Sequence, residues 1–382
     1  MTREQPTGDP RLHALVLDEI RSTGPMSFAR FMELALYHPT HGYYAAGASR
    51  LGPGGDFITA SDVGRAFGRA MARQIDQIDR VVGPFHPFSI VEYGAGRGML
   101  AADVLDALRD EAPGLYERTE YVLVDRSEKM REAARVRVPR AQVVAPEVAG
   151  GGRRGVVIAV ELFDALPVHR VRRRGGRLVE LRVDADPDGL FVERETPADE
   201  TVRDWAARFG AANDEGSEAE VSLSAEPTFD RMASAVERGA MIVVDYGDRS
   251  PALYGDTRRR GTLLAYHRHA THEDCLARVG SQDLTAHVNF SVLEERAVEL
   301  GWDVLALTTQ DRFLVANGIL EEFEQRDLAE SHDPARVKRR LQALQLIHPE
   351  GMGRIFRFLL LSKGAHPPPA LAGAADPFGR GR

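Results

Sequence analysis

Cysteine is almost missing from the sequence, since Cys275 is the one cysteine in 382 residues. A disulfide within the chain is therefore impossible, and a structural zinc site built on several cysteines is excluded. Apolar runs long enough to span a bilayer are missing too, and the first residues show neither a signal-peptide core nor an arginine-rich transit segment. We therefore expect no membrane insertion and a cytoplasmic location.

The sequence also has no excess of positive charge. Its 57 acidic residues outnumber its 49 lysines and arginines and give a formal net charge of −8, whereas a nucleic-acid binder would usually carry a basic footprint. One run of arginines flanks a Gly-Gly turn, but the run alternates with Val171 and favours a solvated hairpin face over nucleic-acid contact. The run comprises Arg170, Arg172, Arg173, Arg174 and Arg177.

No metal-ligand pattern is complete either. Four histidines, two of them in a His-x-His pair, lie in an irregular stretch at 261–290, but no carboxylate spacing completes a recognisable site. We therefore expect no bound metal. The four are His267, His269, His272 and His287.

What the sequence does have is a glycine-rich turn between a short apolar strand and an amphipathic helix. Gly94, Gly96 and Gly98 follow a strand that opens at Ile90, and they precede a helix predicted at 99–108. Glycine tolerates unusual dihedral angles and lets a ligand approach the free N–H groups at the start of the helix. The favoured interpretation is a nucleotide-like cofactor site, and the alternative is a plain glycine-rich βα turn.

The spacing of these glycines indicates which cofactor is bound. A dinucleotide fingerprint reads G-x-G-x-x-G, whereas this turn reads G-x-G-x-G with Glu92 two residues before its first glycine. That form resembles class I S-adenosylmethionine (SAM) methyltransferases. SAM has no pyrophosphate, and a carboxylate such as Glu92 suits its sulfonium or ammonium end. We predict SAM as the cofactor, with a nicotinamide-dependent oxidoreductase as the alternative.

Alternating strands and helices from Ser89 onward predict an α/β fold with a doubly wound, mostly parallel sheet. Acids follow several of the predicted strands, and ligands in such sheets bind at the carboxyl ends of the strands. We therefore expect these acids to share one cleft with the glycine turn. They are Asp125, Glu161, Asp164 and Asp245. For Asp125 we favour ribose binding, and its alternative role is to cap the next helix.

The predicted organisation has four parts. Residues 1–10 are expected to be disordered, and 11–82 form an N-terminal helical segment. Residues 83–363 form the core, with a β-meander inserted at about 167–228 and an irregular insertion at about 250–289. The tail at 364–382 is rich in glycine, proline and alanine and is expected to be disordered.

An ordered set of motifs resembles the MidA family of SAM-dependent methyltransferases over roughly residues 10–362. Mitochondrial members of that family act on a protein arginine during assembly of respiratory complex I. The motifs are Tyr37–Tyr44, Gly55–Ala60, Glu92–Gly98, Glu161–Val168, Asp245–Gly247, Gly261–Tyr266, Gln282–Val288 and Gln310–Leu314. One departure is Val160, which stands where the family usually has asparagine.

The resemblance implies a class I methyltransferase core with an added substrate-side insertion. It implies that the three glycines line SAM, that Glu92 lies below its methionine end and that Asp125 holds the ribose. A loop would close over the cofactor, with Asp56, Phe57 and Thr59 as its contact residues.

The resemblance also implies a protein arginine as the methyl acceptor. A carboxylate pair can bind a guanidinium bidentately and polarise one nitrogen. Glu161 and Asp164 are the candidates, with Asp245 as a third acid. Alternatively, Asp164 caps the helix after the fourth strand and Glu161 contacts SAM indirectly. A small-molecule acceptor, a non-catalytic SAM-binding assembly factor and a homodimer remain open.

Overall fold

The structure is a computed structural model that describes residues 8–45, 64–255, 258–267, 270–324 and 334–378. Contacts divide the chain into two units. The sheet unit comprises Ile58–Leu162, Phe229–Tyr246 and Glu294–Arg382. The insertion unit comprises Met1–Phe57, Phe163–Thr228 and Gly247–Leu293. The core and the two predicted insertions therefore fall largely into different units.

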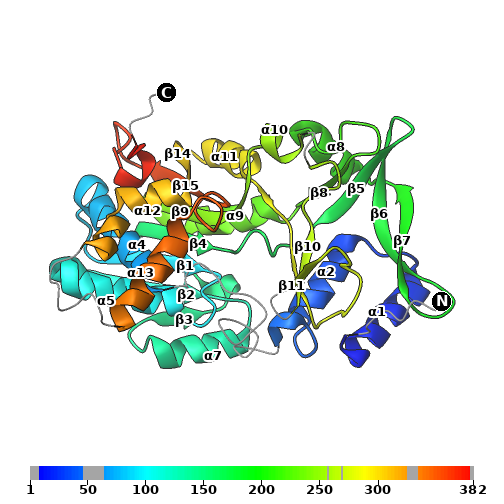
Figure 1. Ribbon diagram of the computed structural model, residues 1–382, viewed down its shortest axis with the longest axis horizontal. Coiled ribbons are helices and arrows are strands. Elements are labelled where there is room, and N and C mark those ends of the chain that lie inside the picture. Colours follow the sequence, from blue (N-terminus) through cyan, green and yellow to red (C-terminus); the bar gives the residue numbers. More distant parts are fainter. Residues whose placement is uncertain (1–7, 46–63, 256–257, 268–269, 325–333, 379–382) are drawn as a thin grey trace. The chain divides into compact units, whose positions relative to one another are not determined.

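A mixed β-sheet forms the centre of the sheet unit (Figure 1). Its strands are β1 (Phe88–Tyr93), β2 (Thr119–Val124), β3 (Gln142–Val144), β4 (Arg153–Val160), β9 (Val236–Asp248), β14 (Asp303–Thr309) and β15 (Phe356–Lys363). They lie in the order β14-β15-β9-β4-β1-β2-β3, and β3, β2, β1, β4 and β9 run parallel. β15 is antiparallel to both β9 and β14. The strand order reverses between β1 and β4, where sheets of this kind bind ligands.

The central strands are apolar because helices cover both faces of a parallel sheet. Every residue of β1 is buried, and the stretches 156–159 and 240–244 in β4 and β9 are fully buried. These are the continuous apolar runs from which the sequence predicts buried strands. The prediction of a mostly parallel α/β sheet is confirmed.

Several helices accompany this sheet. They are α4 (Arg65–Val82), α5 (Met99–Glu111), α6 (Pro113–Arg118), α7 (Glu128–Arg137), α9 (Ala225–Ala235), α11 (Phe290–Glu299), α12 (Gln310–Ala316) and α13 (Pro334–Ile347), with short 3₁₀ turns at Pro146–Val148, Ile319–Phe323 and Ala372–Ala374. α4 buries Phe67, Met71 and Ile75 in the same core as β1 and β4. The N-terminal helical segment predicted at 11–82 is thus divided, because α4 belongs to the sheet unit.

The tail corrects one prediction. Residues 364–378 are expected from their composition to be disordered, but Leu371 is buried and the backbone beside it is hydrogen-bonded to α4. Gly373 N–H donates to Gln74 Oε1 at 2.8 Å, and Ala372 N–H donates to Gln77 Oε1 at 2.7 Å. Two glutamine side chains therefore hold a segment that has little apolar surface of its own. Residues 379–382 lie outside the described residues.

The insertion unit contains two further sheets and a helical pair. Its helices are α1 (Pro10–Thr23), α2 (Phe28–Tyr37), α8 (Glu200–Phe209) and α10 (Ser250–Leu253). One antiparallel sheet has the order β7-β6-β5-β8, with β5 (His169–Arg174), β6 (Arg177–Ala185), β7 (Phe191–Pro197) and β8 (Glu218–Val221). A smaller one has the order β11-β10-β12, with β10 (Leu264–His267), β11 (Ala270–His272) and β12 (Asp283–Thr285). A short strand, β13 (Val288–Asn289), pairs with Gly247 and Asp248 at the end of β9.

Local signals explain most of these elements. Ser27 accepts a hydrogen bond from Arg30 N–H at 3.1 Å and caps α2, and α2 packs on β5 and β6. Asp9 caps α1 in the same way, so residues 8–10 are ordered, and residues 1–7 lie outside the described residues. Glu218–Val221 pairs with β5 to form β8, although this acidic stretch has the composition of a loop.

Cys275 lies in the apolar core of the insertion unit. Only 5% of its surface is exposed. Burial raises the pKa of its thiol to about 12, because the interior disfavours the thiolate. The thiol is therefore neutral at physiological pH.

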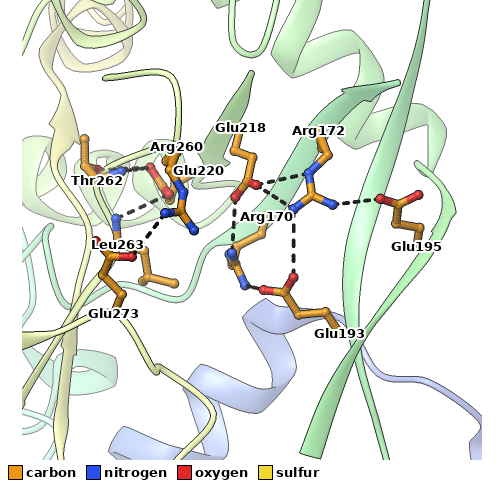
Figure 2. Close-up of polar contacts among 10 residues, drawn as sticks. All are labelled: Arg170, Arg172, Glu193, Glu195, Glu218, Glu220, Arg260, Thr262, Leu263 and Glu273. Carbon is orange, nitrogen blue, oxygen red and sulfur yellow. Dashed lines mark hydrogen bonds and ion pairs between the residues drawn. The ribbon is translucent and has the colours of Figure 1, made fainter. Parts of the chain in front are cut away.

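The arginine run lies within a network of glutamates. Arg170 and Arg172 on β5 face Glu193 and Glu195 on β7 and Glu218 on β8 (Figure 2). Arg172 contacts Glu195 at 2.7 Å and Glu218 at 2.5 Å, and Arg170 contacts Glu218 at 3.3 Å and also pairs with Glu193. Arg170 and Arg172 are ion-paired and partly buried, whereas Arg174 and Arg177 beside the Gly-Gly turn are exposed, as a solvated hairpin face requires. The charge of Arg170 and Arg172 is matched within the sheet.

We expect Arg172→Leu to lower the stability of the protein by about 1–3 kcal/mol, because the largely buried Glu218 loses its shortest ion pair. The measurement is the thermal unfolding midpoint. Arg177→Leu, in the same hairpin but exposed, is the matched control and should change the midpoint little. Equal effects of the two substitutions would contradict a stabilising role for the network.

Candidate active site

The glycine turn leaves the sheet at the carboxyl end of β1. Gly94, Gly96 and Gly98 have φ angles of 70°, 51° and 72°, a left-handed conformation that residues with a Cβ rarely adopt. Gly94 N–H donates to Val124 O at 2.9 Å, which ties the turn to the end of β2. A Cβ on Gly96 would meet nothing within 4 Å, so the middle of the turn faces open space. The turn therefore has both the conformation and the room that a bound ligand requires.

Asp125 follows β2 and binds the same turn. Its Oδ2 accepts Gly96 N–H at 2.9 Å, and its Oδ1 accepts Ser127 N–H at 2.8 Å. The cap of α7 is Ser127, which accepts Met130 N–H, so Asp125 is not that cap. Burial raises the pKa of Asp125, and the two N–H donors oppose that rise. Each carboxylate oxygen keeps a further lone pair with which it can accept a ribose hydroxyl.

Glu92 is buried in β1, two residues before the turn. The Tyr121 hydroxyl on β2 donates to its Oε2 at 2.7 Å. Burial raises the pKa of Glu92 to about 7, and the Tyr121 hydrogen bond opposes that rise. Sequence reasoning missed Tyr121. The available signal was a tyrosine that opens the buried apolar stretch of the strand, since a buried tyrosine hydroxyl usually has a hydrogen-bond partner.

The structure brings the turn that begins at Glu161, just after β4, against Asp245 on β9. Glu161 N–H donates to Val244 O at 2.9 Å, and Leu162 N–H donates to Asp245 Oδ2 at 3.2 Å. Asp245 is fully buried, and its Oδ1 accepts Tyr246 N–H at 2.9 Å. The Asp245 carboxylate thus accepts hydrogen bonds from two backbone N–H groups beside the end of β4.

The unit boundary falls after Leu162, so Asp164 belongs to the insertion unit, where it is buried and its carbonyl accepts Ala286 N–H at 3.0 Å. Asp56, Phe57 and Thr59 lie outside the described residues.

Val160, the departure from the family pattern, is the last residue of β4. It lies opposite Val244 on β9 and is only partly buried. It packs against the apolar core of the sheet unit. The side chain at this position therefore completes an apolar strand end and carries no polar group towards the site.

The histidines of the stretch at 261–290 form no metal site within the residues that the structure describes. No group of three or more histidine, cysteine, aspartate or glutamate side chains in these ranges is arranged to hold a metal ion. His267 Nδ1 instead lies 2.9 Å from Ser281 O, and His269 is outside the described residues. Among the helices that the structure describes, none is long and apolar enough to cross a membrane.

The donor set fits SAM. The open turn at Gly96 leaves room for the ligand, Asp125 can accept ribose hydroxyls, and Glu92 adds a buried carboxyl group two residues before the turn. Residues 66–308 match the family model described as "Putative S-adenosyl-L-methionine-dependent methyltransferase". The chain belongs to the MidA family of SAM-dependent methyltransferases. The predicted family, enzyme class and cofactor are thereby confirmed.

Relatives of this MidA-family chain include named enzymes. The protein arginine methyltransferase NDUFAF7 (mitochondrial) of Danio rerio is 29% identical over 380 residues, covering 89% of this chain and 84% of the relative. The human NDUFAF7 is 28% identical over 377 residues, covering 90% and 81%. A crystal structure of a protein from Burkholderia thailandensis bound to S-adenosyl-homocysteine is 32% identical, with a TM-score of 0.86 and coverage of 98% and 95%.

Glu92 should make the stability of the protein depend on pH. Below about pH 4.5 its carboxyl is protonated in both the folded and the unfolded chain. Between about pH 4.5 and 7 the unfolded chain releases the proton more readily, so Glu92 lowers the free energy of unfolding as pH rises. Glu92→Gln keeps an acceptor for Tyr121 and removes this loss. The free energy of unfolding of the variant should therefore rise relative to that of the wild type by up to about 3 kcal/mol as the pH reaches 7.

The measurement is the unfolding midpoint of both proteins from pH 4.5 to 8. Glu120→Gln, at an exposed position of β2, is the control and should follow the wild type. A constant difference between Glu92→Gln and the wild type across this interval would contradict the raised pKa.

Proposed function

We propose that the chain transfers a methyl group from SAM to a guanidinium nitrogen of a protein arginine. The observation that carries this is the position of Glu161. Its carboxylate directly follows β4, which lies beside β1, and the glycine turn follows β1. The strand order reverses between these two strands. The NDUFAF7 relatives, which are named as protein arginine methyltransferases, support the acceptor class. A carboxylate suits this acceptor because the guanidinium is cationic and forms bidentate hydrogen bonds.

The chain's own residues would perform distinct tasks in the transfer. SAM supplies a methyl group that its sulfonium activates. The glycine turn, Glu92 and Asp125 would hold that cofactor. Glu161 and Asp164, three residues apart in the sequence, would orient the acceptor so that its nitrogen, the methyl carbon and the sulfur lie in line, which lowers the barrier. The nitrogen that gains the methyl group loses a proton, which one of these carboxylates accepts and passes to solvent.

Asp125→Asn should weaken binding of S-adenosyl-homocysteine by about tenfold or more, because the amide group keeps only one acceptor oxygen for the Gly96 and Ser127 N–H groups and a ribose hydroxyl. Isothermal titration calorimetry measures the dissociation constant. Glu128→Gln, which alters an exposed acid in the first turn of α7, is the matched control. Unchanged affinity in Asp125→Asn would overturn the ribose assignment.

Glu161→Gln combined with Asp164→Asn should abolish methyl transfer and leave the affinity for S-adenosyl-homocysteine within about threefold of the wild type, since the proposal places both acids at the acceptor. Turnover is measured with labelled SAM and a confirmed acceptor. Full turnover with unchanged cofactor binding would show that the two carboxylates have another role.

The acceptor itself is identified by comparing a knockout strain with its parent. Lysate of the knockout is incubated with the protein and isotope-labelled SAM, and mass spectrometry locates the label. We expect methylated arginine in a protein that is unmodified in the knockout. Label confined to small molecules would favour a small-molecule methyltransferase, and tight SAM binding without transfer would favour an assembly factor. A cytoplasmic location stays a prediction, which fractionation of the parent strain checks.

A further inference from the structure

The residue that ends β4 has a strained backbone. Glu161 has a φ of 53° and is one of three non-glycine residues with positive φ in the described part of the chain. A side chain with a Cβ disfavours this left-handed conformation, so surrounding contacts must hold it. Its N–H still donates to Val244 O at 2.9 Å, which extends the ladder between β4 and β9 by one residue. Strain at this point matters because Glu161 is the acid proposed to meet the acceptor.

The next hydrogen bond comes from a side chain instead of the strand. Val160 lies opposite Val244, and beyond this pair the β4 chain turns away from β9. Leu162 N–H, which thereby loses its backbone acceptor on β9, donates to Asp245 Oδ2 at 3.2 Å. The Asp245 side chain is fully buried, and its other oxygen is held by Tyr246 N–H at 2.9 Å. Asp245 therefore fixes the peptide that follows the strained residue.

The same turn contacts the cofactor-binding glycines. A Cβ on Gly94 would lie 3.1 Å from Leu162 Cδ1, so the leucine side chain packs directly against the first glycine of the turn. Leu162 is thus held by its N–H to Asp245 and by its side chain against Gly94. A displacement of the 161–162 backbone would therefore move the leucine side chain that contacts Gly94.

We infer that Asp245 is a positioning residue, which keeps Glu161 in its left-handed conformation and Leu162 against Gly94, and that it is not a third acid at the acceptor. This assignment concerns the cofactor side of the site, so it holds whichever acceptor is methylated. It also explains why a carboxylate is needed at a fully buried position. Its two oxygens accept two backbone N–H groups at a point where the strand ladder has ended.

The test separates positioning from acceptor contact by measuring affinity for S-adenosyl-homocysteine with titration calorimetry. Asp245→Asn should weaken this affinity by about tenfold, because the isosteric amide can accept only one of the two N–H groups. In a Glu161→Gly background, Asp245→Asn should weaken the affinity for S-adenosyl-homocysteine by less than about threefold, because glycine adopts a positive φ without support. Glu161→Gln is the matched control. It removes the charge but keeps the Cβ, so Asp245→Asn should still weaken the affinity by about tenfold in that background.

Unchanged affinity in Asp245→Asn, with methyl transfer lost, would overturn the inference and restore Asp245 as an acid at the acceptor. Equal losses in the Glu161→Gly and Glu161→Gln backgrounds would overturn it too. Asp79→Asn, at another buried acid of the sheet unit, controls for a general loss of stability and should leave the affinity unchanged. Should Asp245→Asn fail to fold, recovery of folded, cofactor-binding protein by Glu161→Gly supports the inference, and failure of that recovery overturns it.

Discussion

The parallel pairing of β1 with β2 and β4 determines where the proposed site residues lie. The register pairs the last residue of β1 with Val124 on β2 and with Ala159 on β4, so the three strands end close together. The chain leaves the sheet at three neighbouring points, Gly94, Asp125 and Glu161. Just beyond these points, the N–H groups of Gly96, Ser127 and Leu162 lie past the strand ladder, and buried N–H groups require other acceptors. The carboxylates of Asp125 and Asp245 accept these hydrogen bonds, which gathers acids at the carboxyl ends of the strands, where we propose the cofactor site.

The acids of this protein have two kinds of hydrogen-bond partner, neutral donors and arginines. In the sheet unit, burial raises the pKa values of Glu92 and Asp125, which accept hydrogen bonds from a hydroxyl and from backbone N–H groups. In the insertion unit, Glu218 is neutralised by two arginines of the neighbouring strand (Figure 2). An acid without a fixed cationic partner can respond to a bound cation, whereas an ion-paired acid cannot do so without breaking its pair. The first arrangement suits a binding site, and the second suits a structural sheet.

The sequence was sufficient to predict the features that depend on local patterns. The glycine turn, the acid after β2 and the Gly-Gly hairpin each occupy a few consecutive residues, and each appears as predicted. Contacts that depend on strand register were not predictable. Tyr121 contacts Glu92 only because β2 lies beside β1, and Leu162 reaches Asp245 across 83 residues of sequence. β8 and the ordered tail were missed for a similar reason, since distant segments pair with them and their own composition is that of loops.

The burial of Cys275 has a practical consequence. A thiol that is inaccessible and stays protonated near neutral pH reacts slowly with maleimides and with oxidants, because the thiolate is the reactive species. The protein as it stands therefore provides an almost thiol-free background for site-directed labelling. Cysteines introduced at exposed positions, one in each unit, would carry probes for distance measurements while the native thiol stays unmodified.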